Sequence, residues 1–491
     1  MTETNVGISG LAAYLPSYRV KLRDWCHWNS DNWSKISTVV GASFRMRSPD
    51  ENAYTMAATA VLRLIEQYDI DPDQIGSLAL GTESSTDNSA GAVIVKGMVN
   101  TALRETGRVE ISRACEVPEF KHACLGGVYA MKAAARYLAL DGRERIAVVV
   151  CADIAEYERG TSGEPTQGAG AVAMLVENNP KMLRFELDMS GSASDYRGPD
   201  FRKPFSRFTN QTLEKHGQPR DFPVFNGKYS TTCYVDEVLA AMKDLFRKVK
   251  AAPSAFMKDL GAVFLHRPFL RMAETGLIMS LLYSFALGDD LDQSLLDEYA
   301  RLAGVDGRAL RNELLETKNV YELVEDQTLA VELFPLATAT AKAFRKTEDF
   351  EQLVVKKLRL GGEQMAEVGN LYTASLPVWL AAGLEQAVNE DLQLDNSRFL
   401  TIGYGSGDAA EVIPMRVVAG WQSAAERIQF SQSLATATDL DQSAYETLHD
   451  TGELPFEPTA TQDAFYIASI GARDRHFDDS GIEYYKYRKN T

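Results

Sequence analysis

The sequence predicts an α/β protein built from two similar halves, and two observations carry this prediction. First, several segments are uninterrupted apolar runs, such as 145–153 and 169–176, which is typical of strands buried on both faces of an α/β sheet. Second, one order of elements occurs twice: a helix, a strand with a polar residue at its exit, a helix that opens at a nucleophile-like turn, a strand, a glycine loop and a strand. The copies share no residue-by-residue identity, so the pattern indicates a pseudo-twofold molecule.

The first copy lies within residues 1–180. Apolar residues at helical spacing predict a helix over 52–70, which ends at an Asp-Pro-Asp stop signal. A short buried strand follows at 75–82, so Glu83 comes directly after the end of a strand. The remaining elements of this half are a small-residue helix from Ser89, a helix that begins after Cys124, and strands at 145–153 and 169–176.

The second copy lies within residues 181–491. An amphipathic pattern predicts a helix over 234–249, and the strand that follows at 260–265 has His266 at its exit. The remaining elements of this half are a helix that opens in the block 369–375 and runs to Leu384, strands at 398–402 and 414–420, and the glycine loop 403–407 between those strands.

Two stretches do not fit the repeat. Residues 195–230 are rich in Pro, Arg, Phe and Gly and predict an irregular insertion. Residues 281–360 predict a charged and mostly helical insertion. The tail from residue 429 is acidic and polar as far as 463–470, which predicts one more strand.

Composition excludes several classes of function. The chain has 491 residues, 45% of them hydrophobic, and a net charge of −17, so nucleic acid and anionic membrane surfaces would repel it. A phosphate-bearing ligand therefore needs a local cluster of Lys or Arg. The five cysteines form no CxxC pair and no regular disulfide spacing, which favours a reducing cytoplasm. We expect no membrane association, because the sequence shows no signal peptide and no apolar run of spanning length.

Cys124 is the candidate nucleophile. It lies in the segment FKHACLGG at 120–127, where an apolar helical run begins. A helix start presents unpaired N–H groups and the positive end of the helix dipole, which lower the pKa of a thiol and can hold an oxyanion. The alternative is a buried core cysteine, since free cysteine is among the most buried residue types. Open α/β sheets place their sites at strand ends, so we expect Cys124, Glu83, His266 and the glycine loops to converge.

The chain resembles the hydroxymethylglutaryl-CoA synthases, a family of thiolase-like condensing enzymes. The resemblance covers most of the chain and rests on blocks that occur in the family's order: GTES at 81–84, ACLGG at 123–127, EPTQGAGAVAM at 164–174, HRPF at 266–269, GNLYTAS at 369–375 and GYGSG at 403–407.

This resemblance implies a fold and a reaction. The fold would be a thiolase-like five-layered αβαβα sandwich of two pseudo-repeated halves with helical and irregular insertions, in a homodimer. The reaction would join acetyl-CoA to acetoacetyl-CoA, as in the mevalonate pathway of isoprenoid biosynthesis. The CoA thioesters would be substrates, with no cofactor and no metal. The implied halves are residues 1–180, with Glu83 and Cys124, and residues 181–491, with His266, Asn370, Ser406 and the two insertions.

The same resemblance assigns roles to three catalytic residues. Cys124 would hold the acetyl group as a thioester, because a thiolate exchanges thioesters at little energetic penalty. Glu83 would be the general acid/base that removes a weakly acidic methyl proton in a dry pocket. His266 would polarise the ketone of the second substrate. Without the family blocks, Glu83 reads as a solvated turn or helix cap, and His266 as a hydrogen-bonded structural residue.

Five further residues are predicted to bind substrate. Asn370 would donate a hydrogen bond to the second substrate with Ser406 nearby, and the turn 405–407 would help to hold the thioester oxygen. Tyr157 and Thr166 resemble positions that line the acyl pocket. Arg271 is either a surface cation or a contact for the CoA phosphates. His122, beside the nucleophile, is interpreted as structural.

Several residues depart from the family's pattern. Leu125 replaces a larger residue after the nucleophile, and Arg271 stands where a lysine is usual. Asp408 and the long insertion at 281–360 are further departures. Two alternatives therefore stay open: a β-branching synthase that acts on a β-ketoacyl group held by an acyl carrier protein, and a non-catalytic thiolase-fold scaffold.

Overall fold

The computed structural model describes residues 5–85, 90–200, 222–223, 226–458, 461–473 and 476–489. A ten-stranded sheet runs through it in the order β10-β11-β12-β8-β1-β7-β6-β4-β5, with β9 beside β12. Its strands are β1 (Val6–Tyr14), β4 (Ile75–Gly81), β5 (Glu119–Phe120), β6 (Ile146–Ala155), β7 (Gly168–Asn178), β8 (Leu183–Phe185), β9 (Gly191–Ser194), β10 (Leu260–Leu265), β11 (Arg398–Gly405) and β12 (Ala409–Val417).

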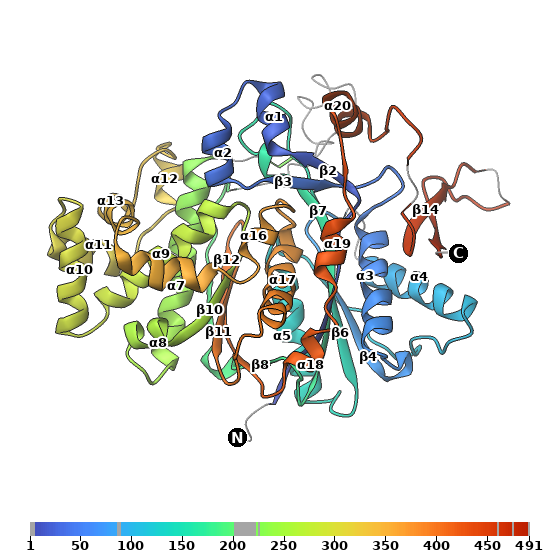
Figure 1. Ribbon diagram of the computed structural model, residues 1–491, viewed down its shortest axis with the longest axis horizontal. Helices are drawn as coiled ribbons and strands as arrows, with labels where there is room; N and C mark the ends of the chain where they lie inside the picture. Colours follow the sequence, from blue (N-terminus) through green and yellow to red (C-terminus); the bar gives the residue numbers. More distant parts are fainter. Residues whose placement is uncertain are drawn as a thin grey trace.

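Helices cover the outer faces of this sheet, and two more helices lie between its two halves (Figure 1). On one outer face, α3 packs on β1, β6 and β7, and α4 packs on α3. In the middle, α5 contacts β4 and β6 while α17 contacts β1, β7 and β10. On the other outer face, α7 packs on β9, β12 and α9. The result is the predicted αβαβα arrangement. These helices are α3 (Ala53–Gln67), α4 (Gly91–Glu105), α5 (Gly126–Ala139), α7 (Lys228–Lys248), α9 (Leu270–Ala286) and α17 (Ser375–Asn389).

The strand pairing shows the predicted repeat directly. In the first half β4 runs parallel to β6, and β6 runs antiparallel to β7. In the second half β10 runs parallel to β11, and β11 runs antiparallel to β12. The short strand β8 pairs with both β1 and β12, so it joins the two halves into one sheet.

Smaller elements surround the sandwich. A three-stranded sheet consists of β2 (Tyr18–Lys21), β3 (Ser43–Met46) and β13 (Thr438–Asp439). The predicted strand near the C-terminus is β14 (Ala464–Ile470), which forms a hairpin with β15 (Glu483–Arg488). Across the described part of the chain, no helix combines the length and apolar composition that a membrane span requires. Helices of this outer region are α1 (Leu22–Asn29), α2 (Trp33–Val39), α18 (Gln422–Ala425), α19 (Phe430–Ala435) and α20 (Gln442–Thr451).

Four predicted boundaries need correction or fall outside the described residues. The helical insertion does not begin at Leu281, because that side chain is buried in the core helix α9. It begins after α9 with α10 (Asp290–Leu302) and α11 (Gly307–Leu315). The glycine loop is shorter than 403–407, because β11 stays paired with β12 as far as Gly405. Most of the predicted irregular insertion, residues 201–221 and 224–225, and the start of the helix at Ser89 lie outside the described residues.

The two halves are also joined by a buried ion pair. Lys132 on α5 donates to Glu411 on β12, with 2.6 Å between Nζ and Oε2, and both side chains are less than a tenth exposed. Ser192 donates a second hydrogen bond to the same carboxylate at 2.9 Å. Removing one member of such a pair leaves an uncompensated charge inside the protein.

We predict that Lys132→Met lowers the free energy of unfolding by about 3–5 kcal/mol, because Glu411 would lose its buried partner. Urea unfolding followed by circular dichroism measures this loss. The matched control is Lys181→Met, whose ammonium is 67% exposed beside Glu177 and whose loss should change stability by less than about 0.5 kcal/mol. Equal midpoints for Lys132→Met and wild type would contradict the assignment.

Candidate active site

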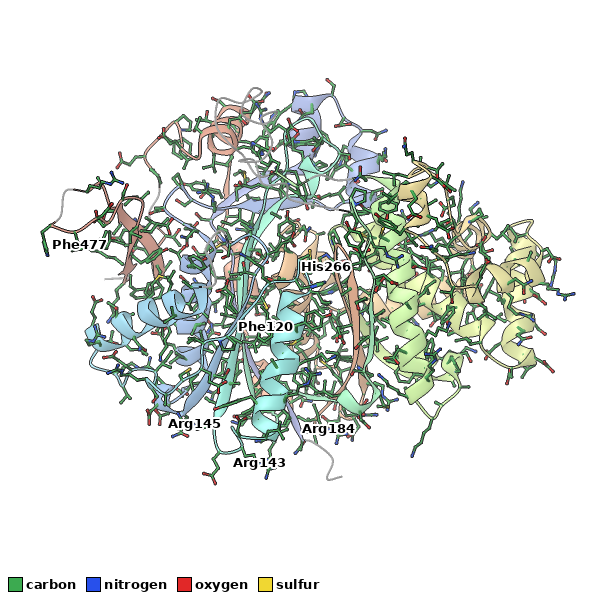
Figure 2. The ribbon with its side chains drawn as sticks, turned by 180° about the vertical axis from the view of Figure 1, so that it is seen from behind. Phe120, Arg143, Arg145, Arg184, His266 and Phe477 are labelled. Carbon is green, nitrogen blue, oxygen red and sulfur yellow. The ribbon has the colours of Figure 1, made fainter. Side chains whose placement is uncertain are left out.

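One cavity of about 290 Å³ collects most of the predicted site residues. It lies where the two halves meet, and Figure 2 shows His266 in the interior, whereas Arg143, Arg145 and Arg184 lie toward the far end of the strands. The predicted residues in its wall are Cys124, Tyr157, Thr166, His266, Asn370 and Ser406. Glu83 reaches the site through Cys124, and Arg271 is not part of the wall.

The thiol of Cys124 is in contact with a carboxylate. Cys124 lies just before α5 and is 6% exposed, and its Sγ donates to Oε2 of Glu83 at 3.1 Å. Glu83 follows the carboxyl end of β4, as the sequence predicts. Ala123 turns the chain into this position with a φ of 42°, a left-handed conformation that costs an alanine about 1 kcal/mol or more. The turn holds the thiol at the start of the helix.

Asp153 organises the loops around this pair, and sequence reasoning did not find its role. The residue lies on β6 and is fully buried. Its Oδ1 accepts hydrogen bonds from the backbone N–H groups of Glu83 (2.7 Å) and Ser84 (2.8 Å) and from the hydroxyl of Thr82 (3.0 Å). Its Oδ2 accepts from the backbone and hydroxyl of Thr373 in the second half. One carboxylate thus fixes the Glu83 loop against the segment that precedes α17.

His266 is a neutral imidazole in the cavity wall. It follows β10, is 2% exposed, and burial lowers its pKa to about 3. Its backbone N–H donates to the carbonyl of Ile402 at 2.7 Å, and its ring stacks on Tyr404 with centroids 6.3 Å apart. Nδ1 is buried without a hydrogen-bond partner among the described residues. A neutral ring with an unengaged nitrogen can donate one hydrogen bond to a bound molecule or accept one from it.

Asn370 and Tyr157 form a polar pair in the same wall. The side-chain amide of Asn370 donates to the hydroxyl of Tyr157 at 3.3 Å, while its Oδ1 accepts from the backbone N–H of Tyr372 at 2.9 Å. Burial raises the pKa of Tyr157 well above its usual value, so the phenol stays protonated. Thr166 donates its hydroxyl to the carbonyl of Gly163, so its methyl-bearing side lines the cavity as a fixed surface.

The turn that carries Ser406 packs tightly on the loop that holds Cys124. A Cβ atom at Gly405 would lie 2.7 Å from the carbonyl oxygen of His122 and 2.8 Å from Cβ of Leu125. Only glycine therefore allows β11 to approach the residues on either side of Cys124 so closely. This approach places the Ser406 turn beside the thiol, as the sequence predicts. His122 itself packs edge-on against Tyr129, with ring centroids 5.5 Å apart.

Arg271 is held away from the cavity. It lies on α9, one turn after Pro268, and its guanidinium is 3.0 Å from Oε1 of Glu274. Glu274 also accepts from Arg345. The guanidinium is a third exposed, which leaves it at the surface near the cavity rather than in its wall.

The rest of the wall is mostly apolar and was not predicted. The start of α9 contributes Phe269 and Met272, the end of α2 contributes Val39 and Val40, and β11 contributes Tyr404. The backbone joins these segments, because the carbonyl of Val40 accepts from the N–H of Leu270 at 3.3 Å. An apolar wall around a thiol, a carboxylate and a neutral imidazole suits thioester chemistry, since it excludes water from a reactive acyl group.

Comparisons with known proteins place the chain in a family. Residues 2–181 match the family model for the N-terminal region of hydroxymethylglutaryl-coenzyme A synthase, and residues 215–453 match the model for its C-terminal region. The mitochondrial hydroxymethylglutaryl-CoA synthase of Sus scrofa is 31% identical over 84% of this chain and 73% of its own length. The hydroxymethylglutaryl-CoA synthase of Haloferax volcanii is 28% identical over 82% of this chain and 80% of its own.

Solved structures give the same fold. The structure of MvaS in complex with 3-hydroxy-3-methylglutaryl coenzyme A has a TM-score of 0.75 and 26% identity, and the match covers 99% of this chain and 100% of that one. The HMG synthase of the curacin biosynthetic pathway in complex with acetyl donor-ACP has a TM-score of 0.68 at 18% identity, over 98% of this chain and 99% of that one. Because the family models cover most of the sequence and its site residues meet in one cavity, this chain belongs to the hydroxymethylglutaryl-CoA synthase family of thiolase-like condensing enzymes.

Proposed function

We propose that the protein condenses acetyl-CoA with acetoacetyl-CoA to give 3-hydroxy-3-methylglutaryl-CoA and free CoA through an acetyl-Cys124 intermediate. The observation that carries this proposal is the 3.1 Å contact between Sγ of Cys124 and Oε2 of Glu83, beside a cavity that also holds His266. The family relatives named hydroxymethylglutaryl-CoA synthase support the choice of substrates.

In the first step the Cys124 thiolate attacks the carbonyl carbon of acetyl-CoA. A C–S bond to the enzyme forms, the C–S bond to CoA breaks, and CoA leaves as a thiol after taking up one proton. Glu83 is placed to accept the proton of the attacking thiol, because the two groups already share a hydrogen bond. The start of α5 lies directly after Cys124, so its positive end stabilises the oxyanion of the tetrahedral intermediate.

In the second step Glu83 removes a proton from the methyl group of the acetyl thioester. The resulting enolate carbon attacks the ketone carbon of acetoacetyl-CoA and forms the new C–C bond, while the C–O π bond of the ketone breaks and its oxygen takes up the proton that Glu83 removed, which gives the 3-hydroxyl group. His266 donates a hydrogen bond to the ketone oxygen, and it polarises the ketone as a neutral ring that carries no full positive charge. Asn370, in the same wall, would add a second hydrogen bond. Water then hydrolyses the thioester to Cys124, which releases the product and restores the thiol.

A second candidate is β-branching on an acyl carrier protein. No Lys or Arg occurs among the residues described in the cavity wall, and the nearby Arg271 is paired with Glu274, so no cation in the wall is reserved for the phosphates of CoA. The structure of the curacin HMG synthase contains a donor-ACP, which supports a carrier as the acyl donor in this fold. A non-catalytic scaffold is disfavoured, because the thiol and the carboxylate remain in contact.

The remaining expectations are part of the same proposal. We propose a cytoplasmic homodimer whose halves are residues 1–180 and 181–491. The five cysteines, Cys26, Cys115, Cys124, Cys151 and Cys233, are all unbridged in the structure, which is compatible with a reducing compartment.

Incubation with acetyl-CoA should add one acetyl group to the wild-type protein, detected by intact-protein mass spectrometry and mapped to the peptide that contains Cys124. Cys124→Ala should lose the adduct entirely, since no other nucleophile in the wall is expected to form a stable thioester. His266→Ala should keep the adduct but lose condensation, because His266 acts only on the second substrate. A wild-type protein that stays unmodified would refute the nucleophile and revive the scaffold alternative.

The acyl acceptor can be decided by turnover. Wild-type protein should condense acetyl-Cys124 with free acetoacetyl-CoA at a kcat/KM at least 10-fold higher than with acetoacetyl carried on an acyl carrier protein, a difference of about 1.4 kcal/mol in transition-state binding. Steady-state release of CoA measures both reactions. The opposite order would replace the main proposal by the β-branching alternative.

Asp153→Asn should slow acetylation of Cys124 about 100-fold. An amide NH₂ would then face the N–H and O–H donors whose hydrogen bonds Asp153 now accepts, and the Glu83 loop would shift. Small displacements of reacting groups have effects of this size. Quenched-flow mass spectrometry measures the rate. The matched control is Asp188→Asn, an exposed site. If Asp153→Asn folds and is acetylated at the wild-type rate, the carboxylate has no positioning role.

A further inference from the structure

A buried cluster of ionisable groups lies against the active-site cavity without a part in the reaction above. Asp200, Cys233 and Asp408 place donor atoms within 4.8 Å of one another, and all three side chains are buried. Asp408 follows directly on the turn that holds Ser406. Asp200 contacts the cavity wall through Tyr404, whose hydroxyl donates to its Oδ2 at 3.0 Å. The cluster is therefore connected to two elements of the site.

The two carboxyl groups are short of hydrogen-bond donors. Oδ1 of Asp408 accepts from the backbone N–H of Gly407, and Oδ2 of Asp200 accepts from Tyr404. The other oxygen of each group, Oδ1 of Asp200 and Oδ2 of Asp408, is buried and has no donor among the described residues. Two adjacent carboxylates in the interior repel each other strongly, whereas one proton placed between them converts the repulsion into a hydrogen bond.

The surrounding charges do not relieve this repulsion. Arg197 has its Nε 3.7 Å from Oδ2 of Asp408, but its terminal nitrogen already serves Asp236 at 2.6 Å and Glu237 at 2.8 Å. Among the residues that the structure describes, the cluster thus has one cation for several acids. The other titratable groups that face it are Cys233 and Tyr229 on α7, Tyr404 on β11, and the more exposed Asp195; Lys318 acts on Asp236.

Burial, followed by the neighbouring charge of Asp200, raises the pKa of Asp408 to about 9. Burial also raises the pKa of Glu237 to about 7, although its hydrogen bond to Arg197 opposes this shift. Asp408 therefore keeps its proton at neutral pH.

We infer that Asp200 and Asp408 share one proton, and that this hydrogen-bonded carboxyl pair is a positioning device for Tyr404 and for the turn at Ser406. Asp200 holds the phenol, and the phenol's ring stacks on His266 at an angle of 25° with centroids 6.3 Å apart. Loss of the proton would push the two carboxylates apart and disturb both contacts. The effect on condensation rests on the proposed function, whereas the shared proton itself does not.

A bound divalent cation is the competing occupant, since Asp, Cys and Asp are all possible ligands. The guanidinium of Arg197 argues against it, because a metal ion beside Asp408 would sit next to a fixed positive charge. Elemental analysis of the purified protein, before and after incubation with zinc or manganese followed by desalting, decides between them. A stoichiometric metal that Asp408→Asn removes would overturn the inference.

The kinetic test compares wild type with Asp408→Asn between pH 6 and pH 10. The amide of asparagine can donate to Asp200 as the protonated acid does, but it cannot lose a proton. We expect kcat for condensation to fall at least 10-fold in wild type as pH rises past 9, and Asp408→Asn to lack this alkaline limb. The matched control Asp259→Asn, at a carboxylate that is 72% exposed, should keep the limb. An unchanged limb in Asp408→Asn overturns the inference.

Stability against pH tests the proton without any substrate. The folded protein keeps the Asp408 proton up to about pH 9, while the unfolded chain loses it near pH 4, so folding takes up a proton between these values. Stability of wild type should therefore fall relative to Asp408→Asn as pH rises from about 4 and level off near 9. Melting temperatures of both proteins measure the difference. A difference that does not change with pH would overturn the shared proton even if condensation is confirmed.

Two further measurements test the inference without Asp408→Asn, in case that variant does not fold. The infrared spectrum of wild type should contain a protonated-carboxyl band at pH 8 that disappears as pH rises through 9, and absence of a band with this titration would contradict the proposal.

Tyr404→Phe, which keeps the ring but removes the hydroxyl, should reduce kcat for condensation at least 5-fold with KM and acetylation of Cys124 little changed. A wild-type kcat in that variant would show that the pair does not act through the phenol.

Discussion

The site depends first on one buried carboxylate, Asp153, which joins parts of the chain that are far apart in sequence. Its two oxygens accept hydrogen bonds from the residues around Glu83 and from Thr373, so the loop after β4 and the segment before α17 have a common anchor. A carboxylate can hold this position only because every lone pair that faces the interior is matched by a donor. The loop that carries Glu83 and the wall that carries Asn370 are thereby fixed by the same group.

Burial then sets the chemical character of each group in the cavity. It keeps His266 neutral and Tyr157 protonated, so both serve as hydrogen-bonding groups rather than charges. The same effect keeps Asp408 protonated, beyond Tyr404. The Glu83 side chain lies in these surroundings and contacts the thiol of Cys124 at 3.1 Å.

Much of this arrangement could be predicted from the sequence. The apolar runs located the strands β4, β6, β7, β10 and β11, and the strand exits located Glu83 and His266. Other features depend on tertiary contacts that leave little local signal. Val39 and Val40 reach the cavity only because α2 docks on α9, which no periodicity shows. The sequence leaves Arg271 either at the surface or on the CoA phosphates. Glu274, an acid three residues later on the same helix, indicates an ion pair with Arg271, and the structure contains this pair. The role of Asp153 was visible only as a polar residue at the end of an apolar run.

The short strand β8 has a consequence for how the chain can be divided. It comes after residue 180, within the second half by sequence, yet it covers the edge of β1 from the first half as well as that of β12. A fragment cut before Leu183 would leave Gly7 and Ile8 of β1 without the strand that pairs with them, and open strand edges invite pairing with other chains.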